Sequence, residues 1–147
     1  MNSAHWHLLL NHLPVVGTFF STIILACGLI FRNDTLKYTG LFFFIATALF
    51  AIPVFLTGEG AEDVLKAIGQ ANKTIIHRHE DISEIAFQLS ISIALLSIGT
   101  LFALHQRKKY AKILLAIVLI AGLGNSVVMV IAGNSGGEIR HTEIRSL

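Results

Sequence analysis

The sequence predicts an all-α integral membrane protein, a four-helix bundle that forms a single domain over residues 1–147. Its composition is 54% hydrophobic and only 14% charged, whereas soluble domains carry about 25% charged residues. The apolar residues form four long blocks, and each holds the roughly 20 residues that cross a hydrocarbon core of about 30 Å. Only helices and closed barrels satisfy their backbone hydrogen bonds in lipid, so blocks of this length are expected to be helical.

The four apolar blocks are 8–31, 38–57, 85–104 and 113–132. Pro14 lies near the start of the first block and Pro53 near the end of the second, where loss of a backbone hydrogen bond is best tolerated. The first 31 residues contain no Lys or Arg, which is unlike a secretory signal peptide. The first block is therefore expected to remain in the protein as a helix.

Two short basic connections predict the orientation in the membrane. Segments 32–37 and 105–112 follow the first and third blocks, so they lie on the same side. Together they hold six basic residues, Arg32, Lys37, Arg107, Lys108, Lys109 and Lys112. By the positive-inside rule this side is cytoplasmic, and both termini are expected on the outer side.

The two outer connections carry their own structural signals. In segment 61–69, Val64, Leu65 and Ile68 form an apolar stripe, and Gly69 is a plausible helix stop. This pattern predicts a short interfacial amphipathic helix between the second and third spans. The glycine-rich segment 133–137 predicts a turn that ends the fourth helix.

A polar stretch, 75–88, leads into the third block. His77, Asp81, Glu84 and Gln88 are spaced so that one helix face carries all four. Such a stripe at the edge of a membrane is costly unless it faces protein, water, a metal or a cofactor. The stretch is therefore the first candidate for a functional site.

Counting about 20 residues outward from the cytoplasmic end of each block brings polar groups from four segments to one level. These groups are His12, Glu59, Glu84 and the segment around Asn134. With the predicted topology, six of the seven histidines and eight of the nine acids lie on this outer side. The sequence thus predicts a histidine and carboxylate cluster at the outer rim.

The cluster favours a site for a transition metal (Fe, Cu or Zn) or for haem b, because imidazole binds these metals and haem iron. The candidate metal ligands are His12, His79, Glu59, Glu84, Glu138 and His141. For haem, we expect His12 to pair with His77 or His79, while Arg78 and Arg140 meet the propionates. His77 and His79 point about 200° apart on a helix, so one of them faces the bundle, and His77 fits the polar stripe better.

These residues suit an electron-transfer protein or a subunit of a larger membrane redox complex. Two alternatives remain: a proton-coupled transporter component that uses the stripe as a proton relay, or a structural subunit whose polar groups cap helices. The expected partners are the lipid bilayer and either other redox subunits or further copies of the chain. The net charge of +2 gives no indication of nucleic-acid binding, and no sequence motif identifies a catalytic residue.

Four motifs carry a resemblance to a known family. They are segments 7–14 (HLLLNHLP), 57–62 (TGEGAE), 79–80 (HE) and 136–144 (GGEIRHTEI). In combination, over nearly the whole chain, they resemble a family of small predicted bacterial membrane proteins of unknown function. The resemblance implies a four-helix protein of the bacterial inner membrane, and it implies no activity.

Overall fold

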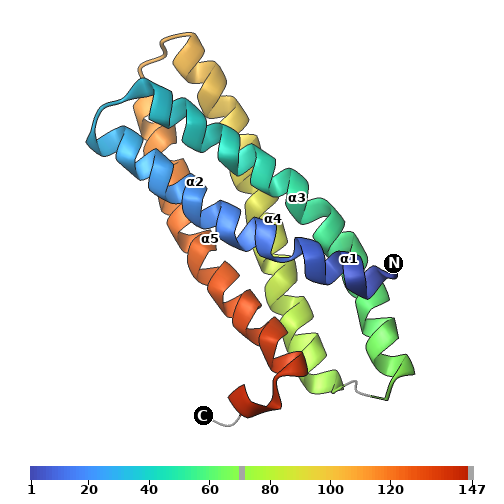
Figure 1. Ribbon diagram of the computed structural model, residues 1–147. Helices are drawn as coiled ribbons and strands as arrows, with labels where there is room; N and C mark the ends of the chain where they lie inside the picture. Colours follow the sequence, from blue (N-terminus) through green and yellow to red (C-terminus); the bar gives the residue numbers. More distant parts are fainter. Residues whose placement is uncertain (70–71, 146–147) are drawn as a thin grey trace.

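The computed structural model describes residues 1–69 and 72–145, and its fold is all-α (Figure 1). The helices are α1 (Ser3–Leu10), α2 (His12–Ile30), α3 (Asp34–Ala67), α4 (Lys73–His105) and α5 (Ala111–Arg140), followed by the short 3-10 helix η1 (Thr142–Ile144). Counting α1 and α2 as one run, four helical segments are long and apolar enough to cross a membrane. The predicted four-span membrane protein is thereby confirmed.

The helices begin and end where short-range chemistry requires it. Asn2, Asn33 and Asn72 cap the starts of α1, α3 and α4, and each side-chain oxygen accepts a hydrogen bond from a backbone N–H three residues later. Arg32 and Arg107 follow the ends of α2 and α4 with a φ of 52°, the left-handed conformation that closes a helix C-terminus. Both basic connections therefore use the same tight turn.

Proline explains why the first span is divided at Asn11. Pro14 has no N–H to donate to the carbonyl of Leu10, and its ring collides with that carbonyl in a regular helix. The chain accordingly ends α1 at Leu10 and restarts at His12. Pro53, in contrast, lies inside the 34-residue α3 rather than near its end.

The predicted interfacial helix between the second and third spans is wrong, because α3 continues without interruption to Ala67. Lys66 pairs with Glu62 at 3.1 Å and with Asp63 at 3.6 Å, contacts that stabilise a helix at these spacings. The stop at Gly69 was located correctly, since its φ is 69°. The expected turn at 133–137 is also wrong, because α5 runs through it to Arg140.

The bundle closes as a ring in which α2 packs on α3, α3 on α4, α4 on α5, and α5 on α2. Its apolar centre contains six buried side chains, Leu25, Leu41, Phe44, Ile93, Leu115 and Val118. Gly40 lets α3 approach α2 closely, since an added Cβ there would lie 2.8 Å from the backbone nitrogen of Leu25. In Figure 1 the two basic connections lie together at one end of the bundle, while both termini lie towards the other.

Candidate functional site

A partly open cavity of about 990 Å³ occupies the end of the bundle that holds the termini. Its lining comes from all five helices and includes His12, Glu59 and Glu84, three of the groups that depth counting brings to one level, together with His141. Its deeper walls are apolar, with Ala86, Phe87 and Met129 among them. The cavity therefore joins a polar rim to an apolar interior.

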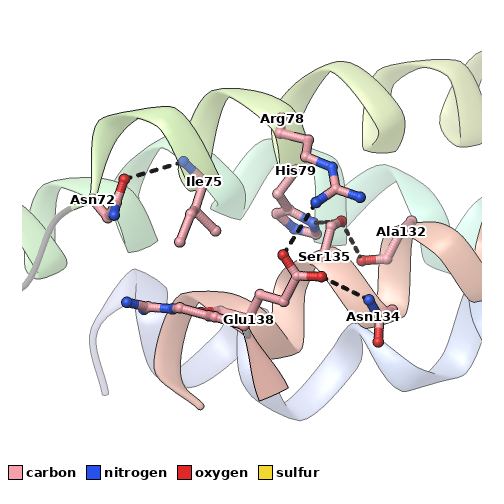
Figure 2. A network of polar contacts seen from close by, with 9 residues as sticks. Asn72, Ile75, Arg78, His79, Ala132, Asn134, Ser135 and Glu138 are labelled. Atoms are coloured by element: carbon pink, nitrogen blue, oxygen red, sulfur yellow. Dashed lines mark hydrogen bonds and ion pairs between the residues drawn. The ribbon is translucent and has the colours of Figure 1, made fainter. Parts of the chain in front are cut away.

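His79, from α4, is held firmly on the wall of this cavity (Figure 2). Its Nδ1 lies 3.0 Å from Oγ of the fully buried Ser135 on α5, and that hydroxyl donates to the carbonyl of Ala132 at 2.9 Å. Because the hydroxyl hydrogen is used, Ser135 must accept from His79, so Nδ1 carries the proton and Nε2 keeps its lone pair. Gly136 makes room for the ring, since an added Cβ would lie 3.0 Å from the His79 Cε1.

His7, from α1, is fixed in a similar way on another wall. Its Nδ1 lies 3.0 Å from the backbone carbonyl of Val54 on α3, which can only accept, so Nδ1 is again the protonated nitrogen. The Thr57 hydroxyl lies 3.4 Å from the same nitrogen, and Gly58 leaves space beside the ring. His7 and His79 are half-buried and close enough for their charges to interact.

His77 does not take the place that the polar stripe predicted for it. Its ring is exposed and pairs with Glu80 on its own helix, at 3.1 Å. The inner face of α4 instead carries His79, Ser83 and Ala86, which repeat at four and three residues. The prediction placed the inner face on Glu84 and Gln88, which are exposed and bonded to each other, and so chose the wrong histidine.

Glu138 and Arg78 form a contact beside the cavity rather than part of its lining. Arg78 Nη1 lies 3.2 Å from Glu138 Oε2, while Asn134 donates to the other carboxylate oxygen at 2.8 Å (Figure 2). The Glu138 side chain is only 13% exposed, so the pair compensates a shielded charge. Arg145 donates to the carbonyls of Glu138 and Ile139 and thereby caps the end of α5.

Of the other predicted residues, Arg140 and His141 line the cavity from the C-terminal end of α5 and the residue after it. His141 Nδ1 also lies 2.8 Å from Glu143. A hydrogen bond from its own backbone N–H, followed by the bond to His141, lowers the pKa of the Glu143 carboxyl. Both side chains are largely exposed to solvent, so the pair contributes little to stability.

One turn below the cavity floor, all four spans bury a polar side chain. Pro14, Ala51, Ala86 and Met129 line the cavity, and four residues further inward on the respective helices lie Thr18, Thr47, Ser90 and Asn125. The Asn125 amide donates to the Ser90 hydroxyl at 3.0 Å and ties α5 to α4. This buried layer separates the cavity from the apolar centre of the bundle.

In residues 1–69 and 72–145, no three His, Cys, Asp or Glu side chains are close enough together to hold a metal ion. Five of the predicted metal ligands line the cavity at separate places, and the sixth, Glu138, lies beside it in a pair with Arg78. Sequence reasoning missed the roles of His7, Ser135 and Asn125. His7 was recognisable only as one of the outer histidines, and neither Ser135 nor Asn125 has a sequence pattern that marks it.

No family model, curated protein or solved structure matches the chain. The four-helix membrane architecture implied by the motifs is confirmed by the structure. Membership of the family that those motifs resemble stays a prediction.

Proposed function

We propose that this is a haem b protein of the bacterial inner membrane, with His7 and His79 as the axial ligands, that transfers electrons as part of a membrane redox complex. The observation that carries the proposal is that the two imidazole rings make equivalent hydrogen bonds through Nδ1. Each has Nδ1 committed to an acceptor at 3.0 Å, which leaves the lone pair on Nε2; the Ser83 hydroxyl approaches this nitrogen of His79 to 3.4 Å. Histidines that ligate metals usually have this second hydrogen bond, because it fixes the tautomer and the ring orientation.

The same geometry favours haem over a bare metal ion. A structural or catalytic zinc site needs three or four protein ligands, and the described residues bring no three together. The porphyrin supplies four ligands itself, so one or two histidines are sufficient. His12, which the sequence favoured as a ligand, lines the same cavity but makes no hydrogen bond among the described residues that would orient its ring.

The rest of the cavity suits the macrocycle. Phe55 and Phe87 stack on its wall with ring centroids 4.4 Å apart, and they add flat apolar surface. Arg140 lines the rim, where its positive charge would attract a propionate, and Arg78 pairs with Glu138 beside the cavity. When bound, haem b supplies a one-electron couple, and the apolar walls and the histidine hydrogen bonds tune its potential.

Three single variants test the assignment of ligands. His7→Leu and His79→Leu should each lower the haem bound per chain, while His77→Leu, which changes an exposed histidine of the same stretch, should retain it. Haem titration of purified protein in one detergent measures all three, and circular dichroism checks that each variant is helical. Equal binding by all variants would refute the axial pair. A helical wild type that binds no haem would instead favour a proton path through the cluster.

A further inference from the structure

The cavity has one side without a packed helix. On three sides neighbouring helices touch, namely α1 with α3, α3 with α4, and α4 with α5. Within the described residues α1 makes no contact with α5, and in Figure 1 the two helices diverge. Further inward the gap is closed, because α2 and α5 pack together where Thr22 and Ser126 approach to 3.4 Å. The opening therefore lies only at the level of α1.

On the α5 side of this opening, a glycine leaves space that a side chain would otherwise fill. Gly122 and Ser126 lie on the face of α5 that contacts α2. Gly133 is seven residues after Ser126, so it continues that face outward by two turns. An added Cβ on Gly133 would meet nothing within 4 Å, although Gly133 itself lines the cavity. Across the gap, the cavity-lining Leu8 of α1 is 63% exposed. The opening thus connects the cavity with the surrounding membrane.

The charges in the lining limit what can enter. Four carboxylates line the cavity, those of Glu59, Glu62, Glu80 and Glu84. Arg140 is the one Arg or Lys among the described lining residues. Away from Arg140, beside which the propionates of the proposed haem would lie, an anionic lipid headgroup or a free phosphate would be repelled by this balance. A neutral ligand that donates hydrogen bonds is favoured instead.

Two lining groups are available to receive such hydrogen bonds. Neither His12 nor Glu59 makes a side-chain hydrogen bond or ion pair with another described residue, and both line the cavity. An imidazole nitrogen and a carboxylate are good acceptors for a phenolic hydroxyl, and they can also accept its proton. A ligand with hydroxyl groups on a flat ring and an apolar tail would match these acceptors, the apolar walls and the membrane opening together.

We propose that the cavity binds a lipid-soluble hydroquinone, which enters from the membrane between α1 and α5 and places its hydroxyls near His12 and Glu59. This inference rests on the proposed haem for its redox partner. Oxidation of one hydroquinone to the quinone releases two electrons and two protons. A haem would take up one electron at a time, so two haems would be needed to oxidise one hydroquinone, while His12 and Glu59 would accept the two protons.

Binding can be measured without haem because Trp6, the single tryptophan of the chain, lies on α1. A decyl-substituted benzoquinone, which shares the ring of the proposed ligand and quenches indole fluorescence, serves as the probe with apo protein in lipid nanodiscs. Saturable quenching is expected. Gly133→Phe should weaken it at least tenfold by filling the opening. Gly124→Phe is the matched control, because that glycine also has nothing within 4 Å of an added Cβ but lies outside the cavity lining.

A second pair of variants tests the head site. His12→Leu and Glu59→Leu should each weaken saturable quenching while the protein remains helical. Quenching that rises linearly without saturation, or that is equal in the two glycine variants, would overturn the proposal. Saturable quenching by a protein that takes up no haem would support the hydroquinone site and refute the haem proposal alone. The two proposals can therefore fail separately.

Discussion

The hydrogen bond between His79 and Ser135 provides a sensitive test of the proposed haem site. Ser135→Ala removes the acceptor for the His79 Nδ1–H, which lies 3.0 Å away at a fully buried position. The other acceptors near the ring are the Ser83 hydroxyl, 3.4 Å from either ring nitrogen, and the Ala132 carbonyl, and they would hold the ring less well. Loss of such a second hydrogen bond typically costs 10- to 100-fold in metal affinity. At about 1.4 kcal/mol per tenfold, this corresponds to about 1.4–2.8 kcal/mol.

The assay is haem titration of detergent-purified Ser135→Ala, monitored by absorbance, beside Ser92→Ala as control. Ser92 is an exposed serine of α4 whose hydroxyl donates only to its own helix, so its removal should leave haem affinity unchanged. Unchanged affinity in Ser135→Ala, with the protein fully helical, would mean that His79 is not a ligand held by this bond. Equal losses in both variants would point to a general effect on the bundle and would also refute the reasoning.

Three further predictions concern packing, pH and orientation. Gly40→Ala should destabilise the bundle by about 1–3 kcal/mol in thermal unfolding, because the new methyl meets the Leu25 backbone at about 2.8 Å, whereas Gly99→Ala meets nothing and should not destabilise it. Haem affinity should fall as the pH drops below the ordinary histidine range near 6.5, because an imidazole must be neutral to ligate and the proton competes with iron for the same nitrogen; an affinity that stays constant from about pH 7 to about pH 4 would contradict this. In a cysteine-free background, a cysteine at position 108 should resist an impermeant maleimide in intact cells while one at position 73 reacts, and the reverse pattern would invert the topology.

Much of the fold follows from the sequence because membrane solvation imposes a simple rule. Blocks of about 20 apolar residues must be helical, so the number of spans was predictable. The ends of the helices were not predictable, because a polar segment outside the hydrocarbon core can either continue the helix or form a loop. Segment 61–67 continues α3 because Glu62, Asp63 and Lys66 support it. Segment 133–137 stays helical in spite of its glycines.

The candidate site was predictable in its location but not in its ligands. Counting residues gives depth, and depth alone brought His12, Glu59 and Glu84 to one cavity, which the fourth span reaches through Gly133 and His141 rather than Asn134. The direction in which a side chain points depends on how its helix is rotated about its own axis. The polar stripe of 77–88 predicted the wrong rotation for α4. The pairing of His79 with Ser135 depends on how α4 packs against α5, and this is a tertiary contact without a sequence signal.

The haem content of the purified wild-type protein tests the central claim most directly. Protein isolated from haem-supplied cells, or reconstituted with haem b, can be assayed as the pyridine haemochrome against protein concentration. The proposed axial pair predicts about one haem per chain, with the absorption spectrum of a six-coordinate iron bound by two imidazoles. A folded, helical protein that shows no haem absorbance after reconstitution would contradict the account of His7 and His79 as axial ligands.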